Sequence, residues 1–326
     1  MYQNFVFLVI RNRCWRIILY EEIKKALSFY CNSNIKSFSS CKTSFDDAKY
    51  VILGVPYDRT SSFRPGSRFA PSYIREASLN IETFNLETML DLEDLKICDI
   101  GDLNVVDNLE KTLRSLEIVI GEIIKANKIP IIIGGEHTIT AGSFKALSKE
   151  SVIIIFDAHL DLRHEFMGTK FSHATFVRRL LMENINSEKI ILVGTRAVCK
   201  EEIDYAKKSE LSYITTDDIK HNGSNKIIKK IESEISDFDK IYISLDMDVL
   251  DPSFAPAVGN PEGFGINTTQ LMDILGALCT HKLIGFDLVE VSPHYDQGIT
   301  TILAANIFFK VISFTEKSIN IFQSSR

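Results

Sequence analysis

Three short motifs of this chain concentrate aspartate and histidine directly after runs of apolar residues. The motifs are Gly134-Gly135-Glu136-His137, Asp157-Ala158-His159-Leu160-Asp161 and Asp246-Met247-Asp248. The runs before them are Ile131–Ile133, Val152–Phe156 and Ile241–Leu245, which have the composition of buried strands. Carboxylates and imidazoles without thiolates suit divalent metals such as Mn²⁺, Co²⁺ or Ni²⁺. One such motif alone could be a solvated strand end, but three at matching strand ends favour a metal site.

The charges of these side chains favour two metal ions rather than one. The four aspartates of the motifs repel one another in a common pocket, and burial makes their ionisation costlier still. Two divalent cations would balance these charges, while neutral histidines fill the remaining coordination positions. Two such ions roughly 3.5–4 Å apart also lower the pKa of a shared water enough to make it a nucleophile near neutral pH.

The composition is that of an ordinary globular protein, with 45% hydrophobic and 25% charged residues among 326. A net charge of −6 without a basic stripe argues against a nucleic-acid partner and is compatible with a cationic substrate. The six cysteines show no C-x-x-C spacing, so we expect free thiols in a reducing cytoplasm. No apolar run approaches the ~20 residues that would span a bilayer, so we expect no membrane partner.

The first twenty residues differ from the rest of the chain. The apolar stretch Phe5–Ile10 precedes Arg11, Arg13 and Arg16, whereas a signal peptide places its positive charges first. We therefore expect residues 1–20 to be an N-terminal extension outside the domain, and residues 21–326 to form a single domain.

Short runs rich in Ile and Val alternate with amphipathic stretches along this domain. The strand candidates are Tyr50–Val55, Leu95–Ile100, Ile129–Ile133, Ser151–Phe156, Ile190–Val193, Leu211–Ile214, Lys240–Leu245 and Leu283–Val289. The helix candidates are Leu109–Lys125, Thr138–Leu147, His173–Glu183, Asn225–Ser236 and Thr268–Cys279. The strands show little apolar–polar alternation, as expected for parallel strands covered on both faces. The sequence thus predicts an α/β fold with a parallel sheet between helices.

All the metal-ligand candidates follow the carboxyl ends of predicted strands, where open α/β sheets bind ligands. Glu290 follows the last predicted strand, and its carboxylate could hold a cationic substrate at the same edge. His173 opens a predicted helix, either as a capping or packing residue or as a proton shuttle at the pocket mouth. Arg68 and Arg75 are expected on the surface or in subunit contacts.

Longer motifs around these residues resemble the ureohydrolases, the arginase and agmatinase family, and agmatinases in particular. Besides the motifs already given, the matching segments are Ser62–Pro71, Ile74–Ala77, Ser172–Thr175, Gly194–Arg196, Ser244–Pro252, Phe254–Pro256 and Gly285–Pro293. The resemblance covers roughly residues 50 to 305. It implies a three-layer α/β/α domain with an eight-stranded parallel sheet of the arginase and deacetylase kind, assembled as a homotrimer or homohexamer.

The resemblance also implies a site with two Mn²⁺ ions and assigns its residues. One ion would take His137, Asp157, Asp161 and Asp246, and the other Asp157, His159, Asp246 and Asp248. Glu290 would hold the guanidinium group of the substrate, Asp161 would pass a proton to the leaving nitrogen, and His173 would relay protons to solvent. The implied reaction is hydrolysis of agmatine to putrescine and urea.

The residues after the second motif bear on which guanidine is bound. In Leu162-Arg163-His164-Glu165, the small polar residues by which arginases hold the arginine tail are absent, and Glu165 would suit an amine tail. Arg163 could instead bind the carboxylate of guanidinobutyrate or arginine. Formiminoglutamate is a further candidate substrate. A one-zinc deacetylase of related fold and a non-catalytic metal-binding oligomer are the remaining alternatives, and the Asp246–Asp248 pair counts against the deacetylase.

Overall fold

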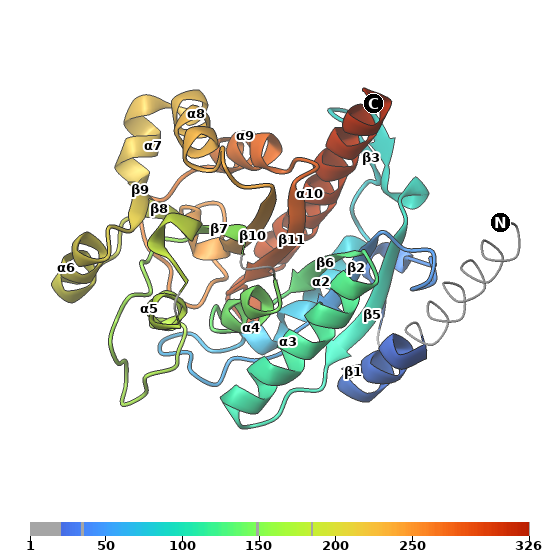
Figure 1. Ribbon diagram of the computed structural model, residues 1–326, viewed down its shortest axis with the longest axis horizontal. Coiled ribbons are helices and arrows are strands. Elements are labelled where there is room, and N and C mark those ends of the chain that lie inside the picture. The colour runs from blue at the N-terminus through green and yellow to red at the C-terminus, as the bar shows by residue number, and fades with distance from the viewer. Residues whose placement is uncertain (1–20, 34–35, 148–149, 184, 326) are drawn as a thin grey trace, which may run out of the picture.

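The computed structural model describes residues 21–33, 36–147, 150–183 and 185–325, and the predicted extension at residues 1–20 lies outside them. Its centre is a nine-stranded sheet in the order β1-β5-β2-β6-β11-β10-β7-β8-β9 (Figure 1). The strands are β1 (Cys31–Asn32), β2 (Tyr50–Gly54), β5 (Ile97–Leu103), β6 (Ile129–Ile133), β7 (Ser151–Phe156), β8 (Ile190–Thr195), β9 (Ser212–Thr215), β10 (Lys240–Asp246) and β11 (Leu283–Val289). A separate hairpin pairs β3 (Phe84–Asn85) with β4 (Leu90–Asp91).

The eight predicted strands are all present and parallel, and a ninth strand corrects the predicted number. β1 pairs with β5 in the antiparallel direction, whereas every other pair in this sheet of described residues is parallel. β1 was not predicted because two residues at a sheet edge are too few to show a strand pattern.

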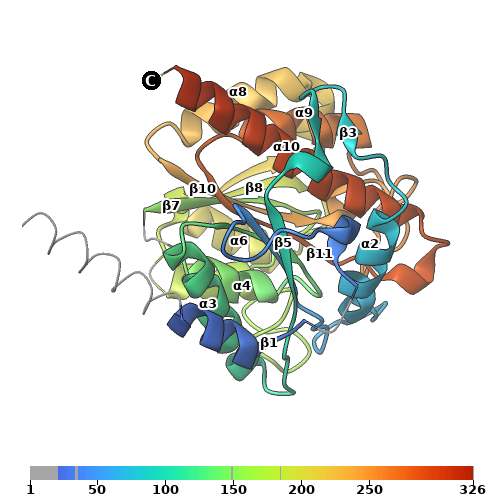
Figure 2. The same cartoon turned by 90° about the vertical axis from the view of Figure 1, so that its right-hand side faces the viewer.

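Helices cover both faces of the sheet, which gives the predicted three layers (Figures 1 and 2). One face packs against α2 (Ala70–Ser78), α7 (Thr216–Asn222), α8 (Ser224–Glu234), α9 (Thr268–Leu278) and α10 (Ile299–Ser324). The other packs against α3 (Leu109–Lys125), α4 (Ile139–Lys145), α5 (Phe176–Met182), α6 (Lys200–Lys208) and the helical residues 21–30. Neighbouring residues such as Ile132 and Ile133 enter opposite core clusters, so both faces demand apolar side chains.

Helix α10 was missed by the sequence analysis, as were α2, α6 and α7. Twelve of its 26 residues, between Thr300 and Thr315, are buried, and they lie on several sides of the helix, so its apolar residues form no single stripe with a helical period. By length and composition it is the one helix among the described residues long and apolar enough to cross a membrane. However, 67% of its most apolar window is buried inside the protein, as a core helix requires.

A buried ion cluster joins α2 to β5 and corrects the expectation that Arg75 lies on the surface. The Arg75 side chain is 1% exposed, and its Nε and Nη2 donate to the two carboxylate oxygens of Asp99 at 2.8 and 3.0 Å. Its Nη1 donates to Asp102 at 2.6 Å, and Nη2 also donates to the carbonyl of Gly101 at 2.9 Å. The guanidinium is therefore buried and paired on every side.

Replacing Arg75 with methionine should lower the free energy of unfolding by about 3–5 kcal/mol, because the change leaves the buried Asp99 carboxylate unpaired. The measurement is urea unfolding followed by circular dichroism. Arg59→Met is the matched control, since Arg59 forms an exposed pair with Asp107 and its loss should change little. Equal losses in the two variants would contradict the structural role of Arg75.

Candidate functional site

The ligand candidates meet at the carboxyl edge of the four adjacent strands β6, β11, β10 and β7. Asp157 follows β7 directly, Asp246 ends β10, and Glu290 follows β11 directly. The strand register places Leu245 beside Phe156, so the residues that follow them, Asp246 and Asp157, leave the sheet next to each other. The parallel sheet therefore brings together two side chains that are 89 residues apart in sequence.

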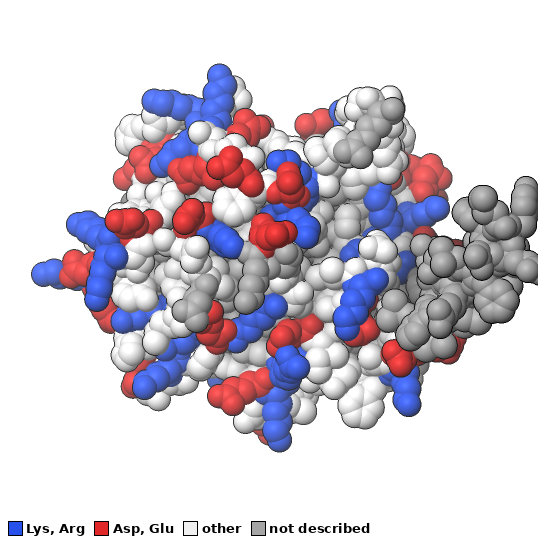
Figure 3. Space-filling view, viewed as in Figure 1, with Lys and Arg blue, Asp and Glu red and all other residues white. Residues whose placement is uncertain are grey.

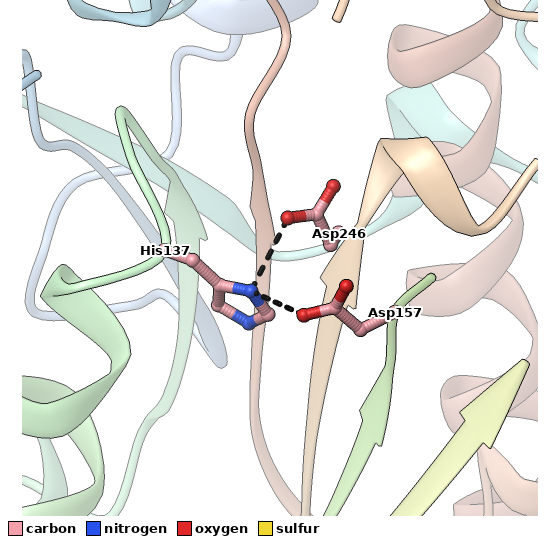
Figure 4. Close-up of side chains that lie close together, drawn as sticks. All are labelled: His137, Asp157 and Asp246. Carbon is pink, nitrogen blue, oxygen red and sulfur yellow. Dashed lines mark ion pairs between the residues drawn. The ribbon is translucent and has the colours of Figure 1, made fainter. Parts of the chain in front are cut away.

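His137 lies at the centre of a first group of possible ligand atoms (Figure 4). Its Nδ1 is 3.0 Å from Asp157 Oδ2, 3.2 Å from Asp246 Oδ2 and 3.5 Å from Asp161 Oδ2. All four of these residues are buried. The structure thus brings together three carboxylates and one imidazole whose oxygen and nitrogen atoms point at a common position.

A second group of possible ligand atoms forms around His159 and shares Asp157 with the first. The Nδ1 atom of His159 is 3.1 Å from Asp248 Oδ2 and 3.3 Å from Asp157 Oδ1. Its Nε2 atom points away from the aspartates and lies 3.7 Å from Glu262 Oε1. The two groups together contain the six residues that were predicted to be metal ligands. Asp161 belongs to the first group through its contact with His137.

Backbone amides orient the aspartates of both groups. Asp157 Oδ1 accepts a hydrogen bond from the amide of His159 at 2.6 Å, and Asp246 Oδ1 accepts one from the amide of Asp248 at 2.8 Å. Asp248 Oδ1 accepts one from the amide of Ala158 at 3.1 Å. Each carboxylate is held through one oxygen; the other oxygen of Asp157 and of Asp246 faces His137 Nδ1, and that of Asp248 faces His159 Nδ1.

Two buried acceptor atoms of this site have no hydrogen-bond partner among the described residues. These atoms are His137 Nδ1 and Asp157 Oδ2. The Ser244 hydroxyl donates its one proton to Asp287 at 2.5 Å, so it can only accept from His137 Nε2 at 3.0 Å. The neutral imidazole therefore carries its proton on Nε2 and turns the lone pair of Nδ1 toward carboxylate oxygens. A metal ion fits between these atoms, as does a proton.

The raised pKa values of His137, Asp161 and Asp246 also show that this cluster favours bound positive charge. Burial lowers the pKa of His137, but the nearby carboxylates of Asp157 and Asp246 outweigh burial and raise it well above its ordinary value. Burial and the charge of Asp248 raise the pKa of Asp246 well above its usual range, and burial and Asp157 do the same for Asp161. The aspartates cannot all ionise unless cations compensate them.

Glu290 lies on the wall of the same site. Its Oε1 accepts a hydrogen bond from the amide of His137 at 2.8 Å, and burial, followed by the charge of Glu136, raises its pKa to about 8. A Cβ at Gly259 would lie 2.9 Å from Glu290 Oε2, so glycine leaves the room that this carboxylate occupies. Glu290 and Asp161 both have positive φ, at 64° and 51°. Such backbone costs a non-glycine residue about 1–3 kcal/mol, and it recurs at functional sites.

His173 lies in a loop and does not open a helix as the sequence predicted, because α5 begins only at Phe176. His173 is 7% exposed, with its Nδ1 3.2 Å from Thr60 Oγ1 and its Nε2 3.3 Å from Ser62 Oγ. Burial, followed by the charge of His159, lowers its pKa to about 4. A neutral imidazole therefore lines the same cavity as the metal-ligand groups.

These side chains line a cavity of about 180 Å³. Its lining residues are Ser62, His137, His159, Asp161, Arg163, Phe166, His173, Ala174, Asp246, Asp248, Asn260, Glu262 and Glu290. Glu262, Asn260 and Ser62 line the cavity but were not among the predicted site residues. The one signal in the sequence is that Glu262 lies in the stretch Asp251–Ile266, whose prolines and glycines indicate an ordered loop. Glu165 is exposed and is not among the lining residues.

Comparison with known proteins agrees with this geometry. Residues 48–313 match the model of the arginase family. The agmatinase of Pyrococcus horikoshii is 34% identical over 274 residues, which cover 83% of this chain and 93% of that protein. The N(1)-aminopropylagmatine ureohydrolase of Thermococcus kodakarensis is also 34% identical, over 83% of this chain and 92% of its own length.

A solved structure gives the same result for the fold. The agmatine ureohydrolase of Thermoplasma volcanium superposes with a TM-score of 0.83 at 38% identity, over 88% of this chain and 96% of that chain. These matches confirm the resemblance drawn from the sequence motifs. The chain belongs to the arginase family and is a ureohydrolase close to the agmatinases.

Proposed function

We propose that this ureohydrolase cleaves agmatine to putrescine and urea with the help of two divalent metal ions, Mn²⁺ in the first instance. The observation that carries the proposal is the cavity in which Glu290 faces two groups of buried ligand atoms. Relatives named for agmatine and aminopropylagmatine, both cationic guanidines, support the choice of substrate. The cavity wall adds a further carboxylate, Glu262, which favours a cationic ligand.

The two metal ions would be held by the two groups of ligand atoms. One would take His137, Asp157, Asp161 and Asp246, and the other Asp157, His159, Asp246 and Asp248. Both imidazoles would bind through Nδ1, since Ser244 occupies Nε2 of His137 and Glu262 lies near Nε2 of His159. When bound, the metals would supply an activated water and stabilise negative charge on the tetrahedral intermediate.

The chain's own side chains would orient the substrate and move its protons. Glu290 would accept hydrogen bonds from the guanidinium nitrogens and hold the planar group with its carbon toward the aspartates. Asp161 would take the proton of the attacking water and give it to the departing nitrogen as the carbon–nitrogen bond breaks. His173 would exchange protons between this centre and the solvent at the cavity mouth.

The tail of the substrate would meet the cavity wall rather than the loop that the sequence suggested. Glu165, the carboxylate expected to bind the amine, is exposed and outside the lining. Glu262 lines the cavity and takes over that role in the proposal. Arg163 also lines it, stacked 5.0 Å from the ring of Phe166 and 4.0 Å from the buried Glu202 carboxylate. The Glu202 carboxylate partly compensates the charge of Arg163, which would weaken the repulsion between Arg163 and an ammonium tail.

We further propose a cytoplasmic homotrimer or homohexamer, as the family resemblance implies. The five cysteines within the described residues are free, which agrees with a reducing compartment. On the face of the described residues shown in Figure 3, lysine and arginine are interspersed with aspartate and glutamate, without an extended basic stripe. This charge distribution suits a small-molecule substrate better than a nucleic acid.

Urea release from Mn²⁺-loaded protein tests the proposed substrate. We expect agmatine to be hydrolysed with a kcat/KM at least tenfold above that of arginine or guanidinobutyrate, because their carboxylates would lie near Glu262. A preference for either acid would instead make Arg163 the residue that binds the tail. Absence of urea with all three, at full metal loading, would contradict the proposed reaction.

Glu262→Gln tests the residue that would bind the amine. The KM for agmatine should rise about fivefold, because a partly exposed ion pair contributes up to about 1 kcal/mol. Butylguanidine, which has no charged tail, should be hydrolysed as before, and Glu165→Gln should leave both substrates unaffected. If Glu262 acted instead by orienting His159, kcat would fall for both substrates alike.

A further inference from the structure

The loop that follows β2 contributes Ser62 to the cavity lining and contacts both nitrogens of His173. Thr60 Oγ1 lies 3.2 Å from His173 Nδ1, and it also accepts a hydrogen bond from the amide of His173 at 3.1 Å. On the other side of the ring, Ser62 Oγ lies 3.3 Å from Nε2. Two hydroxyl groups of one loop therefore bracket the imidazole.

The same threonine is bound to a fully buried carboxylate. Glu136 has no exposed surface, and its Oε1 accepts hydrogen bonds from the hydroxyls of Thr60 at 2.7 Å and Thr138 at 2.6 Å. Its Oε2 accepts a hydrogen bond from the backbone amide of Thr60 at 2.7 Å. Glu136 thus fixes Thr60 through both its backbone and its side chain.

The number of protons available to these hydrogen bonds assigns the tautomer of His173. The Thr60 hydroxyl has one proton, and Glu136 receives it, so Thr60 Oγ1 can act only as an acceptor toward His173. The proton of the neutral imidazole must then lie on Nδ1. The lone pair lies on Nε2, where the Ser62 hydroxyl can donate to it. The opposite tautomer would set two lone pairs against each other at 3.2 Å.

We propose that Glu136 and Thr60 are positioning residues that hold His173 in the Nδ1–H tautomer, so that Nε2 is the nitrogen that accepts protons in the cavity. The inference rests on the proposed function, in which His173 exchanges protons during hydrolysis. Neither residue reaches the reacting atoms: Glu136 is completely buried, and neither it nor Thr60 is among the cavity lining. Both act through the orientation and protonation site of the imidazole.

The backbone around Glu136 explains why the loop after β2 stays in place. The amide of Glu136 donates to the carbonyl of Tyr57 at 2.7 Å. A Cβ at Gly135 would lie 2.0 Å from that carbonyl oxygen, so only glycine permits the two backbones to approach so closely. Asp58 stabilises the far side of the loop by accepting from the amide of Gly66 at 2.8 Å. Thr60 is therefore carried on an anchored segment.

The test compares Thr60→Val, which keeps the shape and removes the hydroxyl, with Thr60→Ser, which keeps the hydroxyl. Nitrogen-15 NMR of the metal-free protein at neutral pH reports which nitrogen of His173 carries the proton. The chain has seven histidines, so the His173 signal is assigned by its loss in His173→Asn. We expect Nδ1 protonation in the wild type and in Thr60→Ser, and loss of that preference in Thr60→Val.

Steady-state urea release from agmatine gives the second readout. Thr60→Val should lower kcat about tenfold with little change in KM, since the substrate does not contact Thr60, and Thr60→Ser should recover most of kcat. Nε2 protonation in the wild type would overturn the proposal, as would a Thr60→Val variant with an unchanged tautomer or an unchanged kcat. If the wild type hydrolysed no guanidine, the NMR result would still decide the tautomer, and only the proposed function would fail.

Discussion

The mutual repulsion of four buried aspartates governs this structure. Their oxygens lie around the Nδ1 atoms of His137 and His159 at 3.0–3.5 Å, inside a protein interior where uncompensated charge is costly. Such a cluster is stable only with protons or metal ions among its oxygens. The other features of the site can be understood as means of keeping these atoms together and aimed at one position.

Several of those means are built from backbone. Parallel strands end side by side at β10 and β7, and amides of the following turns bind one oxygen of each carboxylate. Positive φ angles at Asp161 and Glu290 turn these two side chains into the cavity. The Ser244–Asp287 pair behind His137 and the Glu136–Thr60 pair beside His173 each use the single proton of a hydroxyl to set the state of an imidazole. Both devices place a buried carboxylate one hydroxyl away from the histidine that it controls.

Much of this arrangement could be predicted from sequence because it depends on local patterns. Strands buried on both faces appear as continuous Ile and Val runs, so β6, β7 and β11 have their predicted bounds, and the strand ends locate the six ligand candidates. Helix α10 lacked an amphipathic stripe because it is buried on several sides. The contacts of Glu262 and Thr60 depend on loops that fold back from other parts of the chain, which no local pattern reveals. For the same reason Arg75, whose partners lie on β5, was expected at the surface.

The claim on which the rest depends is that the two groups of ligand atoms each hold a divalent ion. Anomalous X-ray diffraction from crystals grown with Mn²⁺, recorded at the manganese absorption edge, tests it most directly. We predict two manganese peaks in each chain, one bonded to His137 Nδ1 and the other to His159 Nδ1, with Asp157 and Asp246 bonded to both. A single peak, or peaks bonded to other residues, would contradict the claim and would leave protons as the charges that hold the aspartates together.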